Sequence, residues 1–453
     1  MSRLRRLLDR ALGNDQRLST LFRGSALVMA TQIAGIGLAY AMQVIVARWA
    51  GAFEFGIFAY AWTWMNLIFL VAAFGLNESA LRMLPTYAAH SEWSKMRALV
   101  VRGPMLVLTL GSMAGATAVV GLALLGNHVG EHYRVPLMLT FAAAPFFGLL
   151  AFFQGVGRAL GGVFAAFLPR YIGLPALVLL AVGAIVVYGR TPDAALLVMV
   201  TVSAAAVLAI VQGVTLIREL PAEARRVRSI SPVGDWMRLS MPFLFIAVCF
   251  GLLTHCDLLM VGFFLSATDV AIYQAASRTA ALVSFPLFAL NALVAPMIAR
   301  LHAEKRLEDL QRTVTMATQV VFWPCLVGAV IAILGGRYIL GIFGTTFESG
   351  HMVMSILVLG HLINVGTGPV SYLMTMTGNQ DRCAVVWAST VVGQFAINLL
   401  LIPHLGLIGA AIGTTLATSF LCVSLTILVR QKLNIRAHAF VPVCQTFARA
   451  IRP

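Results

Sequence analysis

Residues 24–47 read GSALVMATQIAGIGLAYAMQVIVA, a stretch without a single Asp, Glu, Lys or Arg. A helix that crosses the hydrocarbon core of a bilayer needs about 20 consecutive, mostly apolar residues. This stretch is therefore long enough and apolar enough to span a membrane. Because lipid offers no partner to free backbone N–H and C=O groups, we expect it to be a helix.

Further uncharged stretches follow along the whole chain. They cover residues 55–77, 103–130, 135–157, 171–189, 194–217, 239–256, 279–299, 313–336, 349–380 and 383–429. The last is too long for one crossing, and Pro403, His404 and Gly406 divide it into spans near 384–402 and 407–429. The stretch 239–256 is expected to continue past Asp257 to about residue 265. The sequence thus predicts an all-α polytopic membrane protein with twelve transmembrane helices.

The composition agrees with this prediction. Hydrophobic residues make up 60 % of the 453-residue chain and charged residues 11 %. Soluble domains have about 25 % charged residues. So few charges cannot coat a soluble protein of this size, which excludes an ordinary soluble enzyme, a disordered chain and a nucleic-acid binder. The six cysteines form no CxxC pair, so we expect neither disulfides nor a metal site.

The basic residues predict the orientation in the membrane. With the N-terminus in the cytoplasm, 27 of the 32 lysines and arginines fall in cytoplasmic segments, as the positive-inside rule requires. Both termini are then cytoplasmic, and the net charge of +15 is mostly a topology signal. The arginine-rich N-terminal segment has apolar residues at helical spacing, which is typical of an amphipathic helix on an anionic membrane surface. A basic tail that only sets topology is the alternative.

The predicted spans fall into two halves of similar length. The expected units are a cytoplasmic basic segment, a six-helix N-lobe, a cytoplasmic linker, a six-helix C-lobe and a cytoplasmic tail, at 1–23, 24–217, 218–238, 239–430 and 431–453. Residues 50–58 are weakly similar to 265–273, which indicates an internal repeat. Two lobes of equal topology place a substrate in a central cavity between them, as in transporters.

Motifs of catalysis and nucleotide binding are missing from the sequence. None of the three lysines follows a glycine, so there is no G-K-[ST] phosphate loop. We find no H-E-x-x-H motif, no EF-hand spacing and no paired carboxylates. A transporter or flippase without a cofactor is therefore favoured over a membrane enzyme.

Ionisable residues within the spans are the best candidates for a site, because burying them in a membrane is costly. Arg278 is the clearest, because its guanidinium could bind a phosphate or sugar carboxylate in a watery cavity. An ion pair with Asp257 is the alternative role for Arg278. Asp257 and the nearby His255 are candidates for ion coupling, and Asp257 is equally a candidate structural partner.

The other candidates are assigned by their place in the predicted topology. Arg48, at the outer end of the first span, lines the cavity or anchors the helix at the interface. Arg158 and Arg170 flank a glycine-rich turn, where they contact an anionic headgroup at the inner mouth or only enforce topology. Because cations exceed acids in and near the spans, an anionic substrate is favoured over a cationic drug.

Neutral polar residues within the spans complete the set of candidates, with helix–helix hydrogen bonding as the alternative role for each. They are Gln32, Gln43, Gln154, Asn291, His361, Asn364 and Asn398. Of these, we expect Gln32, Asn291, His361 and Asn364 to line the cavity.

Several motifs resemble those of a known family. Residues 47–58, ARWAGAFEFGIF, are similar to the A-R-x-x-G-x-x-x-[FY]-G-x-[FY] stretch of bacterial oligosaccharide flippases, which belong to the multidrug/oligosaccharidyl-lipid/polysaccharide exporter superfamily. Fragments similar to the family's later motifs follow in order over nearly the whole chain. They include Gly75, Arg82, Pro85 and Tyr87, then residues 257–262 and 271–273, then Arg278, Pro286 and Asn291, then Gly368, Pro369 and residues 401–411.

The resemblance implies a flippase of the bacterial inner membrane. Such a protein moves undecaprenyl-pyrophosphate-linked oligosaccharide to the periplasmic leaflet by alternating access, for lipopolysaccharide, capsule or exopolysaccharide synthesis. Its partners would be the lipid-linked oligosaccharide and membrane lipids, with polysaccharide polymerase machinery as a further candidate and no nucleic acid. The transporter unit would be monomeric. The family's central cavity is cationic, which Arg278 would suit.

Three other interpretations are kept. Lipid II flippases share the pattern of Arg278 and Pro286 but usually have fourteen spans. Cation-coupled multidrug exporters usually carry an acidic residue in the first span, which residues 24–47 lack. Transporters of the major facilitator type also have twelve spans, but their G-x-x-x-D-R-x-G-R pattern is absent between the second and third spans.

Overall fold

The computed structural model describes residues 16–124, 130–227, 233–433 and 435, and all regular structure in this part is helical. The first half holds α2 (Gln16–Val71), α3 (Leu76–Ala89), α4 (Trp93–Leu124), α5 (Glu131–Ala142), α6 (Ala144–Ala159), α7 (Val163–Leu168), the π-helix η1 (Pro169–Gly173), α8 (Leu174–Val187), α9 (Ala194–Glu219) and α10 (Ala222–Arg226). The second holds α11 (Val233–Phe264), α12 (Ala267–Ala281), η2 (Leu282–Ser284), α13 (Phe285–Ala303), α14 (Leu307–Gly341), η3 (Thr345–Gly350), α15 (His351–Thr367), α16 (Val370–Met376) and α17 (Gln380–Leu433). Most of the predicted basic segment 1–23 and of the tail 431–453 lies outside the described residues.

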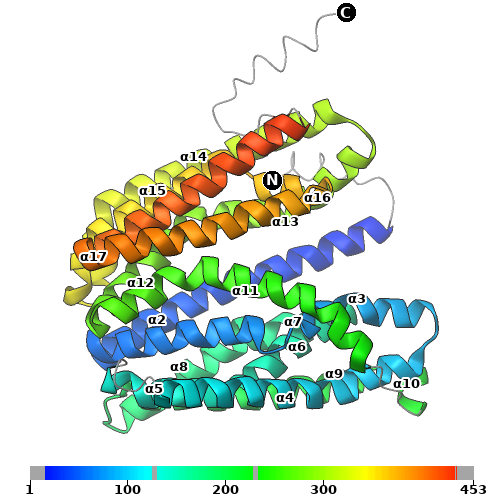
Figure 1. Ribbon diagram of the computed structural model, residues 1–453, viewed down its shortest axis with the longest axis horizontal. Coiled ribbons are helices and arrows are strands. Elements are labelled where there is room, and N and C mark those ends of the chain that lie inside the picture. Colours follow the sequence, from blue (N-terminus) through cyan, green and yellow to red (C-terminus); the bar gives the residue numbers. More distant parts are fainter. Residues whose placement is uncertain (1–15, 125–129, 228–232, 434, 436–453) are drawn as a thin grey trace, which may run out of the picture.

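The helices are long and apolar enough for a multi-pass membrane protein. Eight helices in the described ranges meet this condition, or nine if α5 and α6, bent by 46°, form one span. Two of them turn back on themselves, as Figure 1 shows for α2 and α17. The turns contain Gly51 (φ 82°, ψ 168°) and Gly406 (φ 58°, ψ −136°), backbone conformations that glycine reaches at little steric cost. The count of twelve spans stays a prediction.

Two helical lobes make up the molecule (Figure 1). The first contains α3 to α9 and the second α12 to α17, while α2 and α11 run where the lobes meet. Helix α2 contacts α6 and α8 in the first lobe and α12 in the second. Helix α11 packs on α17 and also on α2 and α3. Side chains of α2, α11 and α12 can therefore reach the space between the lobes.

The lobes are packed closely at one end, here called the Gly51 end because it holds the turn of α2. Rings of Phe55, Phe343 and Phe347 form a cluster across the lobes, with centroids 5.6 to 6.4 Å apart. At Gly56, an added Cβ would lie only 1.7 Å from the carbonyl oxygen of Ala267, so the two backbones touch. The motif at residues 47–58 thus forms a close contact between the lobes.

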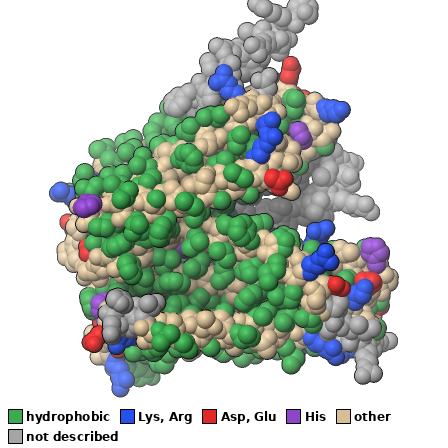
Figure 2. Space-filling view, viewed as in Figure 1, with side chains coloured by type: hydrophobic (Ala, Val, Ile, Leu, Met, Phe, Trp, Pro, Cys, Tyr) green, Lys and Arg blue, Asp and Glu red, His purple; other side chains and the backbone are tan. Residues whose placement is uncertain are grey.

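Apolar side chains cover much of the visible outer surface, and charged side chains gather toward its ends (Figure 2). Leu334, Phe245 and Trp323 are 80 %, 67 % and 61 % exposed. Such a surface would be unfavourable in water, but it matches the hydrocarbon core of a bilayer.

Candidate functional site: a cationic cavity between the lobes

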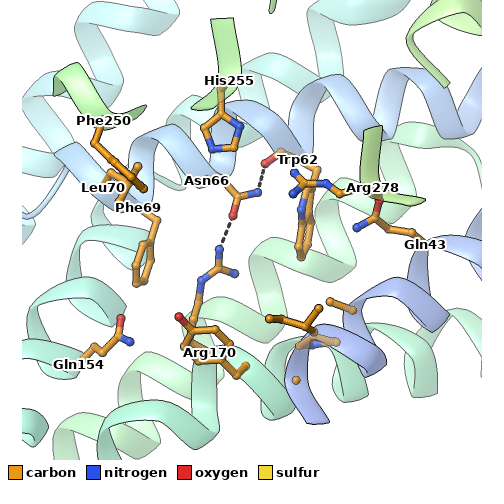
Figure 3. A pocket seen from close by; sticks show the side chains of 15 residues that line it. Gln43, Trp62, Asn66, Phe69, Leu70, Gln154, Arg170, Phe250, His255 and Arg278 are labelled. Atoms are coloured by element: carbon orange, nitrogen blue, oxygen red, sulfur yellow. Dashed lines mark hydrogen bonds between the residues drawn. The ribbon is translucent and has the colours of Figure 1, made fainter. Parts of the chain in front are cut away.

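A cavity of about 330 Å³ lies between the two lobes (Figure 3). Its walls come from α2, α6, η1 and α8 on one side and from α11 and α12 on the other. Three basic side chains lie in these walls: Arg170 on η1, His255 on α11 and Arg278 on α12. No Asp or Glu is among the described residues that line it. The cavity therefore carries a positive charge that no lining carboxylate offsets.

Arg170 is held in place by neutral partners. One of its Nη atoms donates a hydrogen bond to Oδ1 of Asn66, and Nδ2 of Asn66 donates to the carbonyl oxygen of Trp62 at 2.7 Å. The guanidinium carbon lies 4.7 Å from the ring centroid of Phe69 and 5.9 Å from that of Trp62. Cation–π contacts and an amide hydrogen bond orient the group without cancelling its charge. Arg170 is thus a fixed cation facing the cavity.

The π-helix that carries Arg170 packs tightly on α2. A Cβ added at Gly35 would lie 2.6 Å from Cβ and 2.8 Å from the carbonyl oxygen of Tyr171. The two backbones can approach this closely only because residue 35 has no side chain. Short π-helical turns occur mostly as local insertions in longer helices, often at functional sites. Gly35 therefore sets how far Arg170 reaches into the space between the lobes.

Arg278 comes from the opposite lobe and forms no salt bridge with a carboxylate of the described residues. Its Nε is buried without a hydrogen-bond partner in the described part of the chain, and no salt bridge there joins it to Asp257. Asp257 instead accepts hydrogen bonds from the hydroxyl of Tyr273 at 2.8 Å and from that of Thr414 at 3.3 Å. The ion pair considered from the sequence is therefore not formed.

His255 and Asp257 are two residues apart on α11 but have different surroundings. His255 lines the cavity with the two arginines, and Figure 3 shows its ring pointing toward Asn66. Asp257 is buried between α11, α12 and α17, where Tyr273 and Thr414 contact it. The two candidates for ion coupling therefore belong to different sites.

Arg48 and Arg158 contact residues outside the cavity. Arg48 is exposed, and its Nε donates to the carbonyl oxygen of Ile342 across the lobes. Arg158 forms a salt bridge of 3.0 Å with Glu78, in which both side chains are about a third or more exposed. Neither arginine is among the residues that line the cavity of Arg278.

The four neutral polar residues expected to line the cavity also lie outside its lining. His361 pairs with the hydroxyl of Ser284 at 3.2 Å, and Oδ1 of Asn364 lies 3.5 Å from the thiol sulfur of Cys422. Asn291 keeps a buried Oδ1 without a described partner, and Gln32 is partly buried on α2.

Gln43 and Gln154, noted only as polar span residues, do line the cavity.

Sequence reasoning missed the aromatic part of the lining. Trp62, Phe69, Tyr171 and Phe250 all contribute to the cavity wall. Aromatic residues are common in apolar spans, so nothing in the sequence distinguishes these from residues packed in the core. The sequence predicts Arg170 at the inner mouth because an uncharged stretch begins directly after it. The apolar run 163–168 before it was the signal that the helix continues through Arg170.

Sequence comparisons agree with this architecture. A family model described as polysaccharide biosynthesis protein matches residues 21–302, and a model described as MatE matches residues 235–400. The chain is also similar to the probable flippase AglR of Haloferax volcanii, with 29 % identity over 164 residues. That match spans 36 % of this chain and 34 % of AglR, about a third of each protein.

Two solved structures share the fold over almost their whole length. One is an inward-facing multidrug resistance MATE family transporter of the MOP superfamily, with a TM-score of 0.72, 14 % identity, and coverage of 90 % of this chain and 98 % of that one. The other is the lipid II flippase MurJ in an inward closed conformation, with a TM-score of 0.72, 14 % identity, and coverage of 93 % and 89 %. Together with the helices described above, these likenesses confirm the predicted all-α membrane fold.

Proposed function

Because the chain belongs to the polysaccharide biosynthesis protein family, we propose that it is a flippase for lipid-linked oligosaccharide. The observation that carries the proposal is the pair of arginines that meet in one cavity from opposite lobes, with no lining carboxylate among the described residues. The substrate would be undecaprenyl-pyrophosphate-linked oligosaccharide. It would move from the cytoplasmic to the periplasmic leaflet of a bacterial inner membrane, with both termini of the protein in the cytoplasm.

The charge of the cavity suits a pyrophosphate group. A guanidinium presents several N–H donors in one plane, which match phosphate oxygens in pairs. Arg170 is already oriented by Asn66, and Arg278 has a buried Nε without a described partner, so both have donors to offer. In a membrane interior, an anion that enters between them relieves the repulsion of two like charges. Arg278 and Arg170 are therefore the residues that we expect to bind the pyrophosphate.

The rest of the lining suits a sugar. Gln43 and Gln154 add amide groups to the cavity, and Trp62 and Tyr171 add flat aromatic faces. A few polar groups set among aromatic side chains are typical of small-molecule sites. The lipid tail of the substrate would stay in the bilayer, against the exposed apolar surface of the helices.

Alternating access would then proceed by movement of the two lobes around the bound headgroup. The closely packed Gly51 end would correspond to the periplasmic side. There the ring cluster of Phe55, Phe343 and Phe347 would have to separate before the headgroup can leave. Asp257, buried on α11 with Tyr273 and Thr414, is our candidate for ion coupling of this movement.

The two rival functions differ in what they require of the cavity. A cation-coupled multidrug exporter needs a cavity that accepts cationic drugs, which two arginines without a lining carboxylate among the described residues disfavour. A lipid II-type flippase needs the same arginines, because its substrate also carries a pyrophosphate. Competition between substrates therefore has to distinguish an oligosaccharide flippase from a lipid II flippase. The arginines distinguish both of these from a drug exporter.

The test is lipid transfer in proteoliposomes. Fluorescent undecaprenyl-pyrophosphate-linked oligosaccharide should change leaflet faster than in empty vesicles, and unlabelled lipid II should compete poorly. Arg278→Gln removes one charge-assisted interaction, worth about 1.5 kcal/mol or more, so the rate should fall roughly tenfold or more. Arg337→Gln, which changes an exposed arginine of α14, should leave the rate unchanged. A wild-type rate equal to that of empty vesicles would refute the proposal.

A further inference from the structure

His255 is a buried histidine without a described partner in a cationic cavity. It is 8 % exposed and lines the cavity, and neither of its ring nitrogens bonds to another described residue. Buried polar groups are normally hydrogen-bonded, so an imidazole left open toward a cavity is available to a ligand or to a proton. The ring points into the space beside Asn66 and Arg170 (Figure 3).

Among the described residues, the charged side chains that line the cavity with His255 are both cations. They are Arg278 on α12 and Arg170 on η1, which face the same cavity. On α11 itself, Asp257 is turned toward Tyr273 and Thr414. The lining residues of α2 that face the cavity, such as Gln43 and Asn66, are neutral, and Tyr171 of η1 is the other titratable group of the lining. Without a bound anion, a proton on His255 would add a third positive charge to the cavity.

Binding of an anion reverses this balance. A pyrophosphate diester carries two negative charges, which would meet the two guanidinium groups and favour a positive charge on the imidazole beside them. By linkage, an anion that favours protonation of His255 is itself bound more tightly when His255 is protonated. We infer that His255 takes up a proton when an anionic headgroup binds between Arg170 and Arg278, so that anion and proton enter the cavity together.

This inference rests on the proposed anion binding but goes beyond it, because it assigns the proton to one residue. Its sign is definite: anion affinity should fall as pH rises through the titration of His255 in the bound state. One linked proton gives at most a tenfold change in the dissociation constant for each pH unit, because a factor of ten corresponds to about 1.4 kcal/mol. Between about pH 5 and pH 8, histidine is the side chain that usually titrates.

The experiment is isothermal titration calorimetry of the full-length protein in nanodiscs. The probes are sulfate and a soluble pyrophosphate diester, which do not titrate in this range. Repeating each titration in buffers of different ionisation enthalpy counts the protons taken up per anion. The wild type should take up a fraction of a proton approaching one and should bind more weakly as pH rises.

Substitutions of two histidines test whether the proton binds to His255. His255→Gln and His255→Asn should bind the anion without proton uptake and with a flat pH profile. His404→Gln, which changes an exposed histidine of α17, should keep the uptake of the wild type. Anion binding by the wild type without proton uptake would overturn the inference and leave the proposed function intact. Unchanged uptake in a folded His255 variant would also overturn it, whereas no anion binding by the wild type would contradict the proposed function itself.

Discussion

Replacing Gly35 by alanine tests whether the contact between α2 and η1 positions Arg170. The new Cβ would lie 2.6 Å from Cβ of Tyr171, whereas ordinary van der Waals contacts begin near 3.4 Å. The difference, about 0.8 Å, is the distance by which the two backbones must separate along this contact. Tyr171 is the neighbour of Arg170, so the guanidinium should move by a similar amount from Asn66 and from the cavity.

The expected effects on stability and on activity differ in size. Overpacking costs about 1–3 kcal/mol, and the gain in helix propensity of alanine over glycine, about 0.8–1 kcal/mol, offsets part of it. The protein should therefore still fold. A weakened charge-assisted hydrogen bond costs about 1.5 kcal/mol, which lowers the affinity for the anion and the rate of lipid transfer roughly tenfold.

A matched control lies two residues further along the same helix. A Cβ at Gly37 would have no atom within 4 Å, so Gly37→Ala has the same change in composition without the clash. Lipid transfer in proteoliposomes and thermal unfolding in detergent would be measured for both variants. If folded Gly35→Ala transferred lipid as fast as Gly37→Ala, η1 would not be held against α2 as the structure shows, and the assignment of Arg170 would lose its support.

Three further predictions address other parts of the molecule. Gly56→Ala would place a Cβ 1.7 Å from the carbonyl oxygen of Ala267. We therefore expect the free energy of unfolding to fall by about 1–3 kcal/mol, measured by thermal unfolding. An unchanged unfolding temperature would show that the lobes do not touch there. Asp257→Asn replaces the ionisable carboxyl by an amide of the same size, so lipid transfer should become insensitive to imposed ion gradients while anion binding persists. Retained gradient dependence would exclude Asp257 as the coupling residue. Arg158→Gln breaks only the partly exposed pair with Glu78, so stability should change by less than about 1 kcal/mol and transfer should stay within a factor of two; a tenfold slower transfer would instead place Arg158 at the substrate.

Much of the fold was predictable because the signals for membrane helices are local. An uncharged stretch such as 24–47 indicates a span by itself, and the breaks at Gly51 and Gly406 lie between predicted spans. Kinked and merged helices were less predictable, because a π-helix or a continuous α7–η1–α8 segment depends on what the backbone packs against. Because the sequence does not show that the helix continues through η1, it predicts Arg170 at the inner mouth and not in the cavity.

The site was predictable only in part. Arg278 stands out in the sequence because it interrupts an apolar span, and the structure places it in the cavity. Asn291, His361 and Asn364 are equally polar span residues, yet they lie outside the cavity lining and His361 and Asn364 contact neighbours in the second lobe. A polar residue on a membrane helix can face a cavity or a neighbouring helix, and hydropathy is the same in both cases.

The sequence by itself determined that this is an all-helical membrane protein with an excess of basic residues, because hydrophobicity and charge along the chain decide which segments can enter lipid. Only the tertiary structure determined which basic residues of the membrane helices face the same cavity. Arg170 and Arg278 are 108 positions apart, and they reach one cavity because Gly35 lets η1 approach α2 and because α12 packs across α2 from the other lobe. Such convergence depends on backbone contacts between distant segments, which no local pattern of residues records.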